Sequence, residues 1–280
     1  MHRISAPPPD ALTQGVIFTC ALAEDYDECD VAGLIITARC DAYNDKAPIY
    51  NYVPVVKFEN WIVRDGVDAV ANRSLKAALG DMKSFLKGIG EATSLLDFFP
   101  PEQLYREIFV AQSIKNAPAF LKASQRYAAM RDVINLENND RLDVLVSEKS
   151  EAKKFIRELL SNSLAEFHYL PGISPNENVV GHVALLREVR HLPRELAKSV
   201  SRGLDASEYA EVCRKDERSS GRLRIGSDTI AWPIGMLLSP DLELLMQRLT
   251  HLFARVGVAD LSPSTLKMLE SALPEKGAIK

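Results

Sequence analysis

The feature of this sequence that most limits its fold is a change in the spacing of its apolar residues, which occurs twice. The first apolar residues gather in short β-branched and aromatic runs, Gly15–Ala21, Val31–Cys40 and Ile49–Phe58. From Val67 they recur three and four positions apart, which is typical of one face of an amphipathic helix. Strand-like runs return at Ala165–Leu170 and Gly181–Val189. The order strands, helices, strands, helices predicts an α+β fold rather than alternating βαβ units.

The simplest architecture for this order is one small barrel interrupted by helices. We expect residues 11–66 and 163–238 to form the two halves of an SH3-like β-barrel and residues 67–162 to form a helical insertion. Residues 239–280 predict a C-terminal helical hairpin, because Ser239-Pro240 and Ser262-Pro263 are favourable helix starts. Residues 1–10, with three consecutive prolines, predict a disordered lead. Pro54 predicts an edge strand or a bulge.

Composition excludes several classes of protein. The 280 residues are 46% hydrophobic and 26% charged, the balance of a folded globular chain. Because the net charge is −4, any contact with RNA or DNA has to be local. No apolar run reaches the roughly 18–20 residues of a membrane helix. Four cysteines are too few for a disulfide framework, so we expect reduced thiols and a cytoplasmic location. No phosphate-loop, dinucleotide or esterase motif is present, and we expect no cofactor.

A group of basic residues is the candidate binding site. Arg187, Arg190, Arg194 and Lys198 lie close together in the sequence, and the last three stand four apart, on one face of a helix. Phosphate is the natural ligand of such an array. Acidic residues are interleaved with them, so a surface helix held by ion pairs is the alternative.

Three further groups of residues could carry chemistry. Zinc could be held by Cys20, Cys29, Cys40 and His168, although no CxxC or HxxxH spacing supports that site. The acidic stretch Glu24–Asp30 could hold a hard cation such as magnesium, but such runs are more often solvated turns. Cys40 beside His168 or His182 could form an activated thiolate, again without a local signature.

Part of the chain resembles the SH3-like barrel of the MazF/PemK toxin family. The similar features are Gly15, the run Leu34-Ile35-Ile36-Thr37 leading to Asn44, the run Val53-Pro54-Val55-Val56, and a late strand with a short helix over Gly181–Leu196. They cover about a quarter of the chain. Where the family carries Arg-Pro before its second strand, this chain has Val31-Ala32-Gly33.

The resemblance suggests a prokaryotic toxin–antitoxin or phage-defence setting. Since the core pattern carries no catalytic signature, we expect a non-enzymatic binding or regulatory protein with a protein partner or an RNA partner. The alternative is a divergent ribonuclease in which Arg39, Arg187 and Arg190 contact phosphate and Asp41 or His182 transfers protons. A third hypothesis is a zinc-stabilised adaptor.

Overall fold

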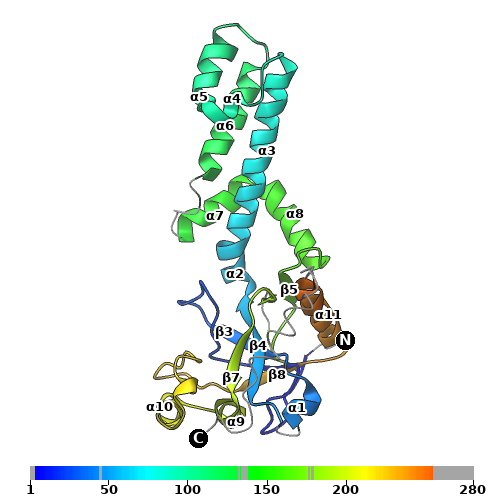
Figure 1. Ribbon diagram of the computed structural model, residues 1–280, viewed down its shortest axis with the longest axis vertical. Helices are drawn as coiled ribbons and strands as arrows, with labels where there is room; N and C mark the ends of the chain where they lie inside the picture. The colour runs from blue at the N-terminus through cyan, green and yellow to red at the C-terminus, as the bar shows by residue number, and fades with distance from the viewer. Residues whose placement is uncertain are drawn as a thin grey trace, which may run out of the picture.

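The computed structural model describes residues 4–43, 46–131, 133, 138–175, 177 and 180–254. In this part of the chain a curled antiparallel sheet carries a long helical arm, so the predicted α+β class is confirmed (Figure 1). The strands are β1 (Ile4–Ser5), β2 (Val16–Phe18), β3 (Val31–Ile35), β4 (Ile49–Lys57), β5 (Phe167–Leu170), β6 (His182–Leu185), β7 (Arg190–Pro193) and β8 (Pro233–Leu237).

These eight strands form one sheet in the order β1-β8-β2-β3-β4-β6-β5, and β7 pairs with β4 beside β6. Every pairing is antiparallel. Strands that precede the arm therefore pair with strands that follow it, and the sheet curls into a half-barrel. The SH3-like topology stays a prediction.

Pro54 lies in the central strand β4 rather than at an edge. On one side of β4, residues Ile49 to Tyr52 pair with β7 and residues Val55 to Lys57 pair with β6. Pro54 falls between these two registers, opposite Gly33 of β3. Proline has no N–H to donate, so it costs the sheet least at a point where the strand-to-strand hydrogen bonds are already interrupted. The prediction of an edge or bulge is thus corrected to a change of partner inside the sheet.

The start of the chain also differs from the expected disordered lead. Ile4 and Ser5 form β1 and pair with Leu237 and Met236 of β8. Ile4 is buried, but a strand of two residues is too short to give a period-two pattern. At the other end, the first helix of the predicted hairpin is α11 (Asp241–Phe253), and the second lies outside the described residues.

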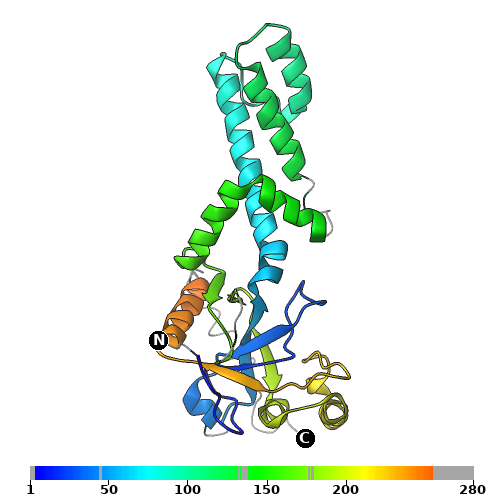
Figure 2. The same cartoon turned by 180° about the vertical axis from the view of Figure 1, so that it is seen from behind.

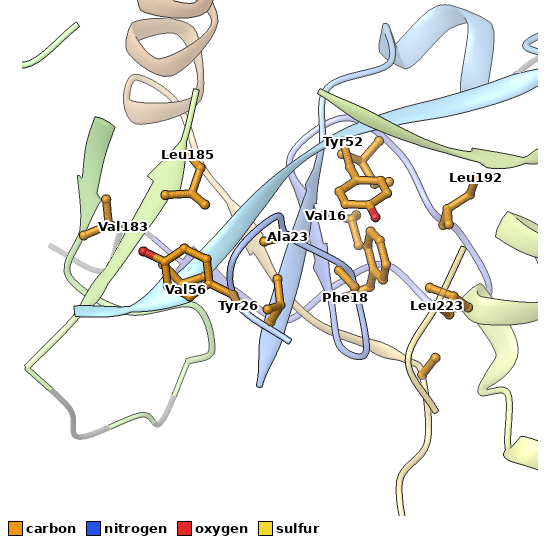
Figure 3. Close-up of a cluster of buried hydrophobic side chains, with 14 of the residues drawn as sticks. Val16, Phe18, Ala23, Tyr26, Tyr52, Val56, Val183, Leu185, Leu192 and Leu223 are labelled. Carbon is orange, nitrogen blue, oxygen red and sulfur yellow. The ribbon is translucent and has the colours of Figure 1, made fainter. Parts of the chain in front are cut away.

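Apolar side chains cover both faces of the sheet. Figure 3 shows one face, where Phe18 and Tyr52 lie beside Val16, and Val56 lies nearer to Val183 and Leu185. The alternate residues of β4, such as Val53 and Val55, point to the other face and pack with Leu242, Leu245 and Leu249 of α11. The remaining helices around the sheet are α1 (Arg39–Tyr43), α9 (Arg194–Arg202), α10 (Ala206–Lys215) and the 3₁₀ turn η4 (Glu217–Ser219).

The arm consists of residues 58–160 and begins without a break at the end of β4. It comprises α2 (Phe58–Trp61), the π-helical turn η1 (Ile62–Gly66), α3 (Val67–Gly88), α4 (Leu95–Phe98), α5 (Pro101–Leu104), the π-helical turn η2 (Tyr105–Val110), α6 (Ala117–Arg131), α7 (Asn138–Ser147) and α8 (Lys149–Leu160). Figures 1 and 2 show α3 leading away from the sheet and α8 returning to it. The far end has its own apolar core, around Met82, Phe109 and Phe120. No described helix is long and apolar enough to cross a membrane.

The base of the arm is fixed to the sheet by aromatic and ionic contacts. The Trp61 ring stacks on Phe155 of α8, with centroids 5.4 Å apart, and meets the edge of Phe167 of β5 at 5.2 Å. Asp65 of η1 accepts a hydrogen bond from the buried Tyr26 hydroxyl at 2.6 Å and pairs with Arg187 at 2.7 Å. The two legs of the arm, α2–α3 and α8, therefore attach at β4 and β5, the two strands that flank β6.

Candidate functional site

The short helix α1 brings two predicted catalytic residues, Arg39 and Asp41, to one end of the sheet. The helix follows β3 after three residues, and the Ala38 carbonyl accepts from the backbone N–H groups of Asp41 and Ala42 at 3.1 Å. Its side chains are largely exposed, and the Cys40 thiol donates to the Asp41 carboxylate at 3.6 Å. Asn44, part of the family resemblance, lies outside the described residues.

Beside α1 lies a cavity of about 630 Å³, which we call the Arg39 cavity. Four segments far apart in the sequence line it: residues 8–13, the α1–β4 region with Arg39 and Tyr50, α9 with Lys198 and Ser201, and β8 with Met236. Two cations predicted separately, Arg39 and Lys198, thus face one space. The Lys198 ammonium also pairs with Glu195 of its own helix at 3.6 Å, and both side chains of that pair are well exposed. Such pairs contribute little and exchange readily.

Hydroxyl groups complete the lining of the Arg39 cavity. The Ser201 hydroxyl donates to the Lys198 carbonyl at 2.8 Å, and the Tyr50 hydroxyl donates to the Ala42 carbonyl at 3.3 Å. The buried Thr13 Oγ1 has no partner among the described residues. Asp10 is the carboxylate of the lining. The hydroxyl hydrogens of Ser201 and Tyr50 are thus engaged, and the donors that the cavity offers to phosphate oxygens are the two cations.

The other predicted binding residues are engaged elsewhere. Arg187 pairs with Asp65 and lies over the Phe167 ring at 5.0 Å. Arg190 pairs with Glu188, and the Arg194 guanidinium donates to the Ala47 carbonyl at 2.8 Å. For Arg187 and Arg190 the ion-paired alternative describes the structure better than a phosphate array, and Arg194 contacts a backbone carbonyl.

The acidic stretch Glu24–Asp30 and the predicted zinc ligands do not assemble into a metal centre. Asp27 pairs with Arg224, and Asp30 pairs with Lys57 at 3.2 Å. Among the described residues, no three His, Cys, Asp or Glu side chains gather in a way that could hold a metal ion. Cys40 lies on α1, and His168 of β5 contacts the Arg248 guanidinium through Nδ1 at 2.8 Å.

A second cavity, of about 370 Å³, lies at the opposite end of the β3–β4 pair, and we call it the His182 cavity. Cys20, Cys29 and His182 line it, so two predicted zinc ligands share one space with a residue predicted for acid–base catalysis. The His182 Nε2 lies 3.5 Å from the Glu177 carboxylate. Burial lowers the pKa of His182, and the Glu177 charge opposes that shift only in part.

The three predicted catalytic residues do not share a cavity. Arg39 lines the cavity at the Ile35 end of β3, whereas His182 lines the one at the Val31 end. Cys40, on α1, is likewise at the opposite end of β3 from His182, so the predicted thiolate pair does not form. Thr13, Tyr50, Ser201 and Glu177 were missed by the sequence reasoning, because no motif marks them.

Comparison with known proteins gives no matching family model, no matching curated protein and no matching solved structure. The resemblance to the MazF/PemK family therefore stays an expectation. What the chain does has to be inferred from its own cavities.

Proposed function

We propose that the protein is a non-enzymatic binding or regulatory protein that holds an RNA partner by its phosphates at the Arg39 cavity. The observation that carries the proposal is that Arg39 and Lys198, which come from distant parts of the sequence, line one cavity. A guanidinium offers a planar fork of donors and an ammonium offers a compact charge, and both suit phosphate oxygens. The toxin–antitoxin or phage-defence setting comes with the barrel resemblance and belongs to the same proposal.

Binding is favoured over cleavage by the chemistry of the lining. Cleavage of RNA needs a proton donor or acceptor within hydrogen-bond reach of the reacting oxygen. No histidine of the described residues lines the Arg39 cavity, and the carboxylate there is Asp10. His182, the predicted acid–base group, lines the other cavity.

The test is a binding titration of a labelled single-stranded RNA of about ten nucleotides, read by fluorescence anisotropy at several salt concentrations. We expect Arg39→Gln and Lys198→Gln each to weaken binding several-fold. Each should also reduce the slope of log affinity against log salt by about 0.7, the value for one lost phosphate contact on a single strand.

The matched control is Lys153→Gln, which removes the same charge from an exposed position on α8. It should leave both affinity and slope unchanged. Equal losses in all three variants, or binding that does not depend on salt, would contradict the proposal. RNA cut by the wild-type protein but not by Arg39→Gln would instead favour the ribonuclease alternative.

A further inference from the structure

A small cavity of about 190 Å³ lies between the loop that follows α8 and the end of α11, and we call it the Arg248 pocket. Figures 1 and 2 both show the end of α8 beside α11. The pocket is lined by Asn162, Ser163, Ala165, Arg248, His251 and Leu252. No Asp or Glu of the described residues belongs to this lining, so the guanidinium of Arg248 determines the charge of the pocket.

The guanidinium of Arg248 is held at the pocket by the loop that lines it. It donates from Nη1 to Asn162 Oδ1 and to His168 Nδ1, both at 2.8 Å, and from Nη2 to the Leu164 carbonyl. Asn162 is itself part of the lining, and Leu164 lies between two residues of the lining. A guanidinium has five N–H groups, so the Nε–H and one Nη2–H of Arg248 have no acceptor among the described residues.

The positive charge of Arg248 also has no carboxylate partner in the described part of the chain. Arg73, Arg126 and Arg187 are part-buried as well, and each pairs with a carboxylate that raises its pKa. The pKa of Arg248 is instead lowered, because burial acts on it without an opposing charge. The C-terminus of α8 carries only about half a negative charge, which offsets part of the guanidinium charge. A part-buried cation in this state favours an anion as its ligand.

The other donors at the pocket indicate which anion fits. Because Asn162 Oδ1 accepts from Arg248, the Nδ2 group of Asn162 is left with two N–H donors. The exposed imidazole of His251 lies one turn from Arg248 on α11 and adds a further N–H donor. The Ser163 hydroxyl contacts the Ser161 hydroxyl at 2.9 Å and is not counted. Donors on three side chains suit a phosphate ion, whose oxygens point in several directions, better than a planar carboxylate.

We propose that the Arg248 pocket binds inorganic phosphate through the unengaged N–H groups of Arg248, the Asn162 amide and the His251 imidazole. The pocket is smaller than the roughly 300–1,000 Å³ of sites for drug-sized ligands, so it suits a small ion better than a whole nucleotide. The site is distinct from the Arg39 cavity, and the proposal does not depend on RNA binding.

The test is a titration of the wild-type protein with inorganic phosphate at constant ionic strength, read from the Arg248 Nε–H resonance in nitrogen-15 spectra. This resonance is assigned by its loss in Arg248→Lys. We expect it to shift and to saturate, and we expect acetate to bind about tenfold more weakly, since acetate has fewer oxygens for the same donors.

Three variants separate this site from other cations. His251→Ala should weaken phosphate binding several-fold. Arg157→Gln, the matched control, removes a charge from an exposed position in the last turn of α8 outside the lining and should leave binding unchanged. Arg39→Gln should also leave the Arg248 shift unchanged, which distinguishes the pocket from the Arg39 cavity.

The proposal is overturned if phosphate leaves the Arg248 resonance of the wild-type protein unmoved or if acetate binds as tightly as phosphate. It is also overturned if Arg157→Gln weakens binding as much as His251→Ala does, because the binding would then reflect general surface charge. The wild-type titrations decide the matter even if a variant does not fold.

Discussion

At the scale of single residues, Gly33 lies at a tightly packed point of the sheet. A Cβ added there would lie 2.4 Å from the Phe18 ring and 2.9 Å from the Tyr52 ring. Both rings are fully buried and pack edge to face at 5.2 Å, so neither can move aside easily. We expect Gly33→Ala to lower the free energy of unfolding of the sheet by about 1–3 kcal/mol, measured by urea denaturation.

Gly80 is the matched control for that substitution. It is exposed on α3, and a Cβ there would meet nothing within 4 Å. Gly80→Ala should stabilise the arm by about 0.5–1 kcal/mol, because alanine restricts the unfolded chain more than glycine does. A Gly33→Ala protein as stable as the wild type would show that the two rings have room to shift.

His182 makes stability depend on pH. Burial lowers the pKa of His182 in the folded protein below the ordinary value of about 6.5, which the unfolded chain keeps. At a pH between the folded and unfolded pKa, the unfolded chain therefore binds a proton that the folded chain does not. The free energy of unfolding should therefore fall as the pH is lowered from about 7 to 5. Removing the imidazole in His182→Gln should make the decline shallower, as measured by urea titrations across that range.

The decline should not vanish in His182→Gln, because burial and Arg222 lower the pKa of His191 in the same direction. His251→Gln, at an exposed position on α11, is the control and should keep the wild-type profile. Identical profiles for wild type and His182→Gln would refute the assignment of this pH dependence to His182.

At the scale of elements, a shared carboxylate joins three parts of the arm. Glu148, between α7 and α8, accepts from Arg126 of α6 at 2.6 Å and from Ser74 of α3 at 2.7 Å. Burial acts to raise the pKa of Glu148, but these hydrogen bonds outweigh it and the pKa lies below its usual value. We expect Arg126→Met to destabilise the arm by about 1–3 kcal/mol, measured by hydrogen exchange of α6 and α8.

The loss of stability in Arg126→Met should become smaller in acid. The ionised Glu148 carboxylate stabilises the fold only at a pH above its lowered pKa, and this contribution disappears as Glu148 becomes protonated. Lys154→Met removes the cation of an exposed pair with Glu151 on the same helix and should change stability by less than about 0.5 kcal/mol. Equal effects of the two substitutions would mean that the Glu148 cluster is merely a surface contact.

The sequence predicts those elements whose signal is local. The spacing of Val67, Val70, Ala78, Met82 and Leu86 predicts α3, and all five side chains are buried there, as expected. The helix α10 was not predicted. Asp205 and Glu208 form a capping box at its start, and the spacing of Asp and Glu three residues apart could have indicated this helix.

The cavities could be predicted only in part. Arg39, Lys198 and His182 were recognised as polar residues with possible chemistry, but their separation into two cavities depends on tertiary contacts. Arg39 and Lys198 line the same cavity because β7 pairs with the start of β4 and is followed by α9 at that end of the sheet. Glu177 and Thr13 belong to loops whose positions no periodic pattern encodes.

At the scale of the whole molecule, the far end of the arm and the sheet have separate interiors, while the base of the arm shares the core of the sheet. The buried cluster of Met82, Phe109 and Phe120 shares no residue with the two clusters of the sheet. We expect unfolding in urea to proceed in two steps, the far arm first, because such cores open independently. Amides of α4 to α6 should exchange with solvent before those of β3 and β4, as measured by hydrogen exchange.

The fluorescence of Trp61, buried at the base of the arm, supplies a second probe. Its transition should occur at higher urea than the loss of helical circular dichroism from the far arm. Coincident transitions by both probes would mean that the molecule unfolds as one cooperative unit.

The attachment of the arm on either side of β6 has a mechanical consequence. One leg continues from β4 and the other leads into β5. Both strands are hydrogen-bonded to β6, which lies between them. Rotating one leg about the other would shear hydrogen bonds along both borders of β6 at once. Twisting of the arm is thus opposed by two sets of strand hydrogen bonds. Bending of the arm away from the sheet would instead strain chiefly the stacked rings of Trp61 and Phe155 at its base.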